Sequence, residues 1–207
     1  MPLQNRVTPF GEIVAIPARG TLMGNRGVIH DAQRHIVRDW QVRRWIACRL
    51  EFRGRHRAVM QPGRWTELFF LDEAAALADG HRPCAECRFR DFRAFQASWQ
   101  RVYPNRSASA DAMDVVLQAE RRIARFQKRT YVAKIDSLPD GTYIGVDGRA
   151  WLVLEDGLLA WSGDRYTARM PRPRGGEVTV LTPPSIVAVL RAGYKPGFHD
   201  TVDFIVA

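Results

Sequence analysis

Two cysteines of the chain stand at a spacing that lets one tight turn place both thiolates on the same metal ion. They are Cys84 and Cys87, in the run Pro-Cys-Ala-Glu-Cys. A turn of this kind also directs backbone N–H groups at the sulfurs, and thiolates are preferred ligands of Zn²⁺. The pattern therefore predicts two of the four ligands of a tetrahedral metal site.

The residues ahead of these cysteines predict the elements that hold them in place. Leu68–Leu71 is an uninterrupted apolar run, typical of a strand covered on both faces. Asp72 can cap a short helix over Glu73–Ala78, and Gly80 stands where a glycine in the left-handed conformation would end that helix. We therefore expect a packed strand and helix to fix the Cys-x-x-Cys turn.

This stretch resembles the zinc-binding module at the N-terminus of the bacterial Ada methyl-phosphotriester repair protein, and similar short modules appended to some nucleases. Those modules contain an aromatic strand, a helix, an aromatic residue and an Arg-Pro-Cys-x-x-Cys run, in that order. The corresponding residues are Phe69-Phe70, Glu73 to Gly80, His81 and Arg82 to Cys87. The resemblance covers residues 45–90 approximately, and it implies a zinc ion and action on DNA.

The resemblance also implies two further ligands from the segment ahead of the aromatic strand. Cys48 is the one remaining cysteine, and His56 lies at a suitable distance before Cys84. The family spaces its first ligand pair closely, whereas seven residues separate Cys48 from His56, so His81 and His35 are kept as alternatives. Four N/S ligands make a closed, structural zinc site, whereas three leave one position open to water. The predicted zinc ligands are Cys48, His56, Cys84 and Cys87.

Arginine dominates the segment around the first predicted ligands. Alternation over Ile46–Phe52 predicts a half-buried strand with Cys48 on its apolar face. Arg53-Gly54-Arg55 predicts a hairpin turn, with His56–Met60 as the returning strand. We expect this ribbon and the helices after it to contact nucleic-acid phosphates, a solvated charged face being the alternative. The predicted contacts are Arg43, Arg44, Arg49, Arg53, Arg55, Arg57, Arg88, Arg90, Arg93, Arg121, Arg122 and Arg125.

A glycine-rich run, Gly20–Gly27, precedes this segment. Its glycine density is typical of a loop that approaches something closely, and a turn between strands is favoured over a phosphate cradle. His30 and Asp31 follow, but adjacent residues of a strand point to opposite faces and are not expected to touch. If the chain is an enzyme, the catalytic candidates are His30, Asp31 and Glu67.

The remainder of the chain predicts two helices and then a β module. The apolar spacing of Phe89, Phe92, Phe95 and Trp99 predicts a helix over Glu86–Arg101, and a second helix is expected from Ser109 to Arg129, with Met113, Val116, Leu117, Ile123 and Ala124 buried. Short apolar runs separated by Asp-Gly pairs predict antiparallel hairpins. The expected strands are Tyr131–Ile135, Thr142–Val146, Ala150–Leu154, Leu158–Trp161 and Val178–Leu181, followed by a helix over Ser185–Arg191 that ends at Gly193.

The net charge of +9 is distributed unevenly along the chain. From Ile135 onward there are 7 basic and 9 acidic residues, which leaves 24 of the 31 basic and 13 of the 22 acidic residues before it. This asymmetry favours two modules and a polyanionic partner for the first. No signal peptide or membrane-spanning stretch is predicted, and three cysteines do not make a disulfide framework, so we expect a cytoplasmic protein without a membrane partner.

Together these patterns predict an α+β protein: an Ada-like zinc module with flanking helices over residues 1–130, joined to a small antiparallel β module, a meander or open barrel, over 131–207. The expected function is zinc-stabilised binding of nucleic acid, DNA rather than RNA, in repair or in recognition of modified DNA. One alternative is a DNA-processing enzyme, a hydrolase of modified bases or damaged DNA, with a pocket near Gly20–Asp31. The other is a basic surface that docks an acidic protein.

Overall fold

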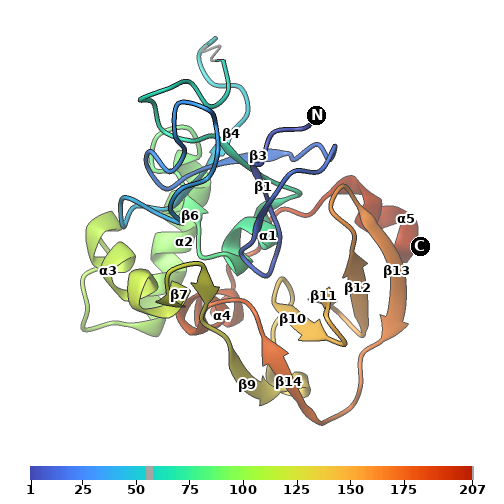
Figure 1. Ribbon diagram of the computed structural model, residues 1–207. Coiled ribbons are helices and arrows are strands. Elements are labelled where there is room, and N and C mark those ends of the chain that lie inside the picture. The colour runs from blue at the N-terminus through green and yellow to red at the C-terminus, as the bar shows by residue number, and fades with distance from the viewer. Residues whose placement is uncertain (55–57, 207) are drawn as a thin grey trace.

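The fold comprises two six-stranded sheets that lie side by side, with a short helix, α1 (Glu73–Ala78), between them (Figure 1). It is seen in a computed structural model that describes residues 1–54 and 58–206. The alanines of α1 pack in one core cluster with residues of both sheets, among them Phe70 and Leu152. Helices and antiparallel sheets together confirm the α+β class.

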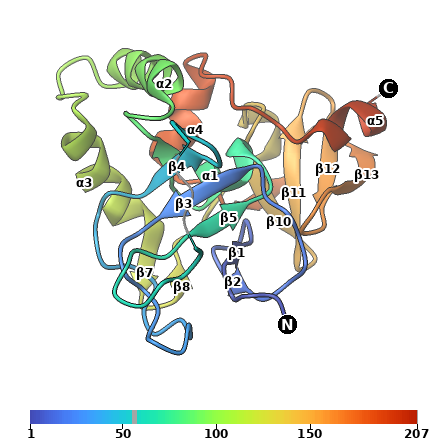
Figure 2. The same cartoon turned by 90° about the horizontal axis from the view of Figure 1, so that it is seen from above.

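The first sheet has the strand order β2-β1-β5-β3-β4-β6. β3 pairs antiparallel with β4 and β5, whereas β1 pairs parallel with β5, and β6 pairs parallel with β4. Figure 2 shows β1 to β5 on one side of the molecule and β10 to β13 on the other. The strands are β1 (Arg6–Val7), β2 (Ile13–Val14), β3 (Leu22–Asn25), β4 (Ile46–Arg49), β5 (Leu68–Phe70) and β6 (Arg82–Pro83).

Helix α1 forms as its sequence predicts. The Asp72 side chain accepts a hydrogen bond from the N–H of Ala75 at 2.9 Å, which satisfies one of the donors left open at the helix start. Gly80 has φ of 86°, the left-handed conformation that ends the helix. The six helix residues are all buried, so α1 is a core element and not a surface support.

The glycine-rich run is a strand, not the expected loop. Leu22–Asn25 forms β3 in the interior of the first sheet, and the close approach that its glycines permit is to the neighbouring strand β5. A Cβ at Gly24 would lie 2.4 Å from Cε2 of Phe70, and one at Gly20 would lie 2.3 Å from the carbonyl oxygen of Phe70. Glycine is needed here because two strands meet over a buried aromatic ring.

Strand β4 differs from its prediction in its buried face and in its partner. Ala47 is the buried residue, while Ile46 and Cys48 are half-buried on the opposite face. The expected hairpin with His56–Met60 is wrong for the residues described, because β3 and β6 already occupy both edges of β4 and none of residues 58–60 is in a strand. Arg55, His56 and Arg57 lie outside the described residues.

The two helices after the cysteines pack on α4 (Pro184–Arg191). α2 (Phe89–Val102) buries Phe92, Phe95 and Trp99. The prediction that Phe89 shares that face is wrong, since its side chain is exposed in the first turn.

The second of these helices, α3 (Ala110–Arg121), is capped by Ser109 and ends eight residues before the predicted end. The chain then turns into the hairpin β7 (Arg122–Ala124) and β8 (Gln127–Lys128), which leaves Ile123 and Ala124 exposed instead of buried.

The second sheet is antiparallel throughout, with the order β13-β12-β11-β10-β14-β9. β10 to β13 form a meander, as one of the two predicted arrangements has it, but β14 is inserted between β10 and β9. Asp147 and Gly148, both at positive φ, form the turn between β10 and β11 as predicted. The next turn is Glu155-Asp156 instead of Asp156-Gly157, because Gly157 pairs with Leu154. The strands are β9 (Tyr131–Lys134), β10 (Tyr143–Val146), β11 (Arg149–Leu154), β12 (Gly157–Trp161), β13 (Tyr166–Pro171), which was not predicted, and β14 (Glu177–Val180).

The end of the chain packs back on the first part of the molecule. α4 (Pro184–Arg191) contributes Ile186, Val189 and Leu190 to the core cluster that holds α2 and α3. Short helices follow near β13: η2 (Asp200–Val202) and α5 (Asp203–Val206), while η1 (Ile135–Ser137) succeeds β9. The division at residue 130 stays a prediction, and both main core clusters contain residues from either side of it.

Candidate metal centre and adjoining pocket

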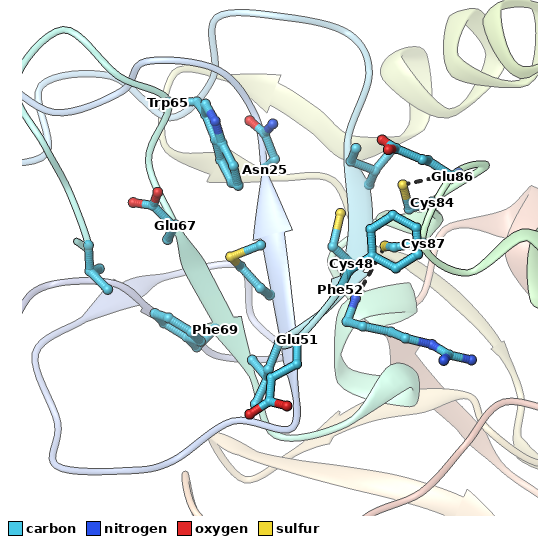
Figure 3. A pocket seen from close by; sticks show the side chains of 15 residues that line it. Asn25, Cys48, Glu51, Phe52, Trp65, Glu67, Phe69, Cys84, Glu86 and Cys87 are labelled. Carbon is cyan, nitrogen blue, oxygen red and sulfur yellow. Dashed lines mark hydrogen bonds between the residues drawn. The ribbon is translucent and has the colours of Figure 1, made fainter. Parts of the chain in front are cut away.

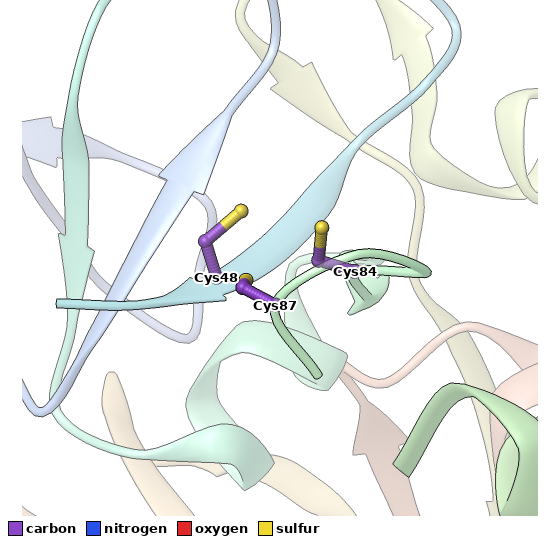
Figure 4. Close-up of side chains that lie close together, drawn as sticks. All are labelled: Cys48, Cys84 and Cys87. Carbon is purple, nitrogen blue, oxygen red and sulfur yellow. The ribbon is translucent and has the colours of Figure 1, made fainter. Parts of the chain in front are cut away.

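Three cysteines converge because β4 and β6 run parallel at the edge of the first sheet. Cys48 belongs to β4, and Cys84 follows β6 directly, where its backbone N–H donates to the carbonyl of Ala47 at 3.0 Å. The turn that begins at Cys84 then returns Cys87 to the same place. The three Sγ atoms all lie within 4.8 Å of one another (Figure 4). Strand pairing therefore brings together cysteines that lie far apart in the sequence.

The surroundings of the sulfurs suit a thiolate-bound ion. The backbone N–H of Glu86 lies 3.4 Å from Sγ of Cys84, and that of Arg49 lies 3.4 Å from Sγ of Cys87. Hydrogen bonds from the neighbouring cysteine thiols, Cys48 first, lower the pKa of Cys84, so negative charge gathers on its sulfur. Three soft sulfur donors at this separation fit Zn²⁺, whose thiolate ligands lie about 2.3 Å from the metal.

The cysteines are the only cluster of metal-ligand side chains found among residues 1–54 and 58–206. His56 lies outside those ranges. His81 is fully buried between the rings of Trp45 and Phe70, with its Nδ1 3.3 Å from Asp79, as a packed core histidine. His35 is exposed, and its Nδ1 lies 3.4 Å from Asp31. Neither reserve ligand reaches the cysteines.

A pocket of about 560 Å³ opens beside the cysteines, over the outer face of the first sheet (Figure 3). Alternation along the strands selects its lining: Trp65, Glu67 and Phe69 recur at every second residue along the β5 segment. Cys48, Met23 and Phe69 are partners across β4, β3 and β5. The remaining lining residues are Asn25, Ile46, Arg49, Leu50, Glu51, Phe52, Val59, Cys84, Glu86 and Cys87.

Of the three catalytic candidates, Glu67 is the one that lines this pocket. It is buried, and its Oε2 accepts a hydrogen bond from the N–H of Met60 at 2.7 Å. His30 is buried elsewhere, with its Nδ1 2.6 Å from the Thr66 hydroxyl and its Nε2 3.2 Å from the Gln61 carbonyl. Asp31 accepts backbone hydrogen bonds within its own loop, which lower its pKa. The structure does not bring the three together.

The predicted phosphate contacts divide into three groups. Arg88 is paired with Glu73 at 2.8 Å, Arg122 with Asp79 at 3.1 Å, and Arg121 donates to the carbonyl of Gly80 at 3.0 Å. These three guanidinium groups are buried, so their assignment to a phosphate-binding surface is wrong. Arg55 and Arg57 are not among the described residues. Seven of the set are exposed: Arg43, Arg44, Arg49, Arg53, Arg90, Arg93 and Arg125.

Burial removes little of the net positive charge from the surface. The described residues include five buried arginines, Arg26, Arg82, Arg88, Arg121 and Arg122, and six buried carboxylates, Asp39, Glu67, Asp72, Glu73, Asp79 and Asp114. Their charges nearly cancel. The +9 of the chain is therefore carried by its other residues.

The enzyme alternative expected a pocket near Gly20–Asp31, and Met23 and Asn25 of that run line the pocket, but its position beside the cysteines was not predicted. Trp65 and Phe69 line it because the outer face of the β5 segment, which was expected to be covered, borders the pocket. Asn25 lines it from a strand in a run that was expected to be a loop. The alternation of Trp65, Glu67 and Phe69 was the available signal, but the apolar run from Leu68 to Leu71 obscured it.

Compared with known protein families, curated proteins and solved structures, the chain matches none of them. The Ada-type relationship therefore remains a resemblance carried by the residues around Cys84 and Cys87. The structure adds to it a cluster of three cysteines that could hold a metal ion.

Proposed function

We propose that this chain holds a zinc ion with Cys48, Cys84 and Cys87 and binds nucleic acid, DNA foremost, through the arginines beside that centre. The observation that carries the proposal is the position of the exposed arginines relative to the cysteines. Arg49 follows Cys48 and lines the pocket, while Arg90 and Arg93 lie in the first turns of α2, which begins two residues after Cys87.

The metal centre would fix these arginines relative to one another. The backbone N–H of Arg49 donates a hydrogen bond to Sγ of Cys87 at 3.4 Å. The turn from Cys84 to Cys87 leads directly into α2. Arg90 and Arg93 are three residues apart on a helix, so their side chains share one exposed face. An ion bound by the three sulfurs would hold this face in a fixed position relative to Arg49.

Fluorescence anisotropy of the zinc-loaded chain with a labelled DNA duplex of random sequence, measured at several salt concentrations, tests the proposal. Affinity should fall steeply as salt rises, because each phosphate contact releases counterions. Addition of a chelator should weaken binding, since Arg49 and α2 would lose their common anchor. Binding that is absent at low salt would overturn the proposal.

A pair of variants tests whether these particular arginines make the contacts. Arg90→Gln with Arg93→Gln should weaken binding at every sequence and reduce the slope of log affinity against log salt by about 2. The matched control is Arg149→Gln with Arg174→Gln, which removes the same charge from exposed positions in β11 and in the loop between β13 and β14. Equal losses in both pairs would show a diffuse charge effect instead of a defined surface.

A second candidate function is favoured by the pocket. Three cysteine ligands would leave one zinc position open, and the buried carboxylate of Glu67 lines the same cavity, as in a hydrolase that acts on modified bases or damaged DNA. Incubation of DNA with the zinc-loaded chain and mass spectrometry of the released or altered bases tests this. A product that Glu67→Gln abolishes, without weakening salt-sensitive binding, would support the enzyme.

The third possibility, an acidic protein partner, uses the same arginines. It predicts a protein that co-purifies with the chain and that DNA does not displace. Displacement of such a partner by DNA would instead place both on the proposed nucleic-acid surface.

A further inference from the structure

The pocket beside the cysteines has a wall suited to a flat ring. Trp65 and Phe69 are half-buried and lie on the opposite side of the pocket from the cysteines (Figure 3). Met23 of β3 lies between them, since it pairs with Phe69 on one side and Cys48 on the other. Ile46 and Leu50 add apolar surface from the β4 segment. Aromatic side chains that line a cavity can stack on a nucleobase whichever base it is, because every base has a planar π-face.

Hydrogen-bonding groups in the same pocket remain available. Oε2 of Glu67 accepts from the N–H of Met60 at 2.7 Å, and an ionised carboxylate has lone pairs on its two oxygens for further hydrogen bonds. A ligand N–H could therefore donate a charge-assisted hydrogen bond to this carboxylate. On the neighbouring strand, Oδ1 of Asn25 accepts from the N–H of Gly27 at 2.8 Å, which leaves the amide NH₂ of Asn25 as a donor.

Acceptor and donor therefore lie on adjacent strands of one sheet face. Met23 pairs with Phe69, and the same antiparallel register continued by two residues sets Asn25 opposite Glu67. A carboxylate that accepts from an exocyclic amine, beside an amide that donates to a ring nitrogen or carbonyl, matches the edge of adenine, cytosine or guanine. Thymine fits less well, because its one N–H is flanked by two carbonyl oxygens that repel the carboxylate.

Charged residues of both signs line the pocket, and two of them differ in exposure. Glu67 is buried, which disfavours a phosphate beside it, whereas the side chain of Arg49 is exposed. Arg49 lines it as well, and the guanidinium of Arg53 lies 4.9 Å from the ring of Phe52, another lining residue. A nucleotide has the same order of charge, with amine donors on its base and a phosphate at its other end. At about 560 Å³ the cavity is within the usual range of small-ligand sites.

We propose that this pocket binds one unpaired, amine-bearing nucleobase, stacked on Trp65 and read by Glu67 and Asn25, with its phosphate outside on Arg49 and Arg53. This inference rests on the proposed nucleic-acid binding and names the part of the ligand that enters the site. An unpaired base is required because the edge that Glu67 and Asn25 would contact is occupied in a duplex.

The test compares short labelled oligonucleotides bound to the zinc-loaded chain at moderate salt: oligo-dA, oligo-dC, oligo-dT and an abasic strand of equal length. Oligo-dA and oligo-dC should bind about tenfold more tightly than oligo-dT, and the abasic strand most weakly. Trp65→Leu should remove about tenfold from the affinity for all base-bearing strands. Glu67→Gln, which keeps an oxygen for Met60, should abolish the preference over oligo-dT.

Matched controls separate these effects from misfolding. Trp40→Leu replaces a tryptophan that is exposed and outside the pocket lining, and it should leave the order of affinities unchanged. Circular dichroism melts of all variants identify any that do not fold. A Glu67→Gln chain that fails to fold is replaced by Asn25→Asp, which removes the donor at the surface of the pocket and should weaken binding of the same bases.

The outcomes distinguish this inference from the proposed function. Salt-sensitive DNA binding with equal affinity for all four strands, unaffected by Trp65→Leu, overturns the base pocket and leaves the function standing. If no strand binds, the proposed function fails, and calorimetric titration with uncharged adenosine and cytidine decides the pocket. Binding of neither nucleoside, or binding only of simple organic cations such as tetramethylammonium, overturns it.

Discussion

Asp79, at the end of α1, neutralises two buried arginines that the sequence distributes far apart. It is paired with Arg26 of the segment after β3 and with Arg122 of β7, and His81 lies beside it. Arg26, Arg121 and Arg122 also lie over the ring of Trp45, at 4.2, 4.6 and 5.0 Å from its centroid. Several arginines counted toward a surface are therefore internal, where each positive charge is compensated by a carboxylate or a ring face.

His81 should make the stability of the protein depend on pH. Burial, followed by the charges of Arg26 and Arg121, lowers the pKa of His81 to about 3, against the influence of Asp79, which raises it. The unfolded chain takes up this proton near pH 6.5, so the stabilisation is fully present above pH 6.5 and is lost as pH falls toward 3. We expect wild type to lose about 2 kcal/mol from this group between about pH 7 and about pH 4.5.

His81→Phe provides the comparison, because phenylalanine keeps an aromatic ring between Trp45 and Phe70 without a titrating group. Urea unfolding at both pH values should show a smaller loss for the variant, since Asp79 and the buried arginines are common to both chains. Identical pH dependence in the two proteins would mean that His81 does not bind its proton in the way described.

At the scale of elements, the first sheet depends on the close approach of β3 and β5. Gly24 faces the core beneath Phe70, while its neighbours Met23 and Asn25 line the pocket on the other face. β3 thus places a glycine on the face of the sheet that is packed in the core and two pocket-lining residues on the opposite face. Because successive residues of a strand alternate in direction, a change on the buried face also moves the residues of the pocket.

Gly24→Ala should destabilise the chain by about 1–3 kcal/mol, because its Cβ would lie 2.4 Å from Cε2 of Phe70 and force the two strands apart. Chemical denaturation measures the change. Gly175→Ala is the matched control: a Cβ there meets nothing within 4 Å, and the residue is not at positive φ. Equal stability of the two variants would mean that β3 and β5 do not need a glycine at their closest approach.

At the scale of the whole molecule, the cysteine cluster that could hold a metal ion lies apart from the hydrophobic core. The cysteines lie at one edge of the first sheet, whereas the core clusters join α1 to both sheets and α2 to α3 and α4. Polar contacts add to these connections, since the Tyr166 hydroxyl donates to Asp72 at 2.7 Å and Tyr143 bonds Tyr166 at 2.7 Å. Among the described residues, no helix has the length and apolar character needed to cross a lipid bilayer.

Removal of the metal should therefore lower the stability of the molecule without unfolding it. A chelator added to the zinc-loaded chain is expected to reduce Tm by several degrees, because it removes the ion that would join β4 to the Cys84 turn. Far-ultraviolet circular dichroism should still show a cooperative transition. Cys84→Ser is the control, and its Tm should not respond to the chelator. An unchanged Tm in the wild type, or complete unfolding, would contradict this division.

The ends of several helices and turns are determined by residues close together in the sequence. Asp72 and Gly80 bound α1, Ser109 begins α3, and Asp147-Gly148 turns β10 into β11, because caps and tight turns are formed by residues a few positions apart. The Cys84–Cys87 turn belongs to the same class, and from its spacing alone it could be predicted that these two cysteines lie close enough together to hold a metal ion.

Tertiary structure decided the rest. Only the parallel pairing of β4 with β6 brings Cys48 to Cys84, and only the sheet shows that Gly24 lies under Phe70 and that Trp65, Glu67 and Phe69 line a pocket. Whether Arg90 is exposed or Arg121 buried likewise depends on which elements cover each helix face. The physical reason is that burial and strand pairing are set by contacts between segments distant in sequence, whereas caps, turns and ligand spacing are set by neighbours.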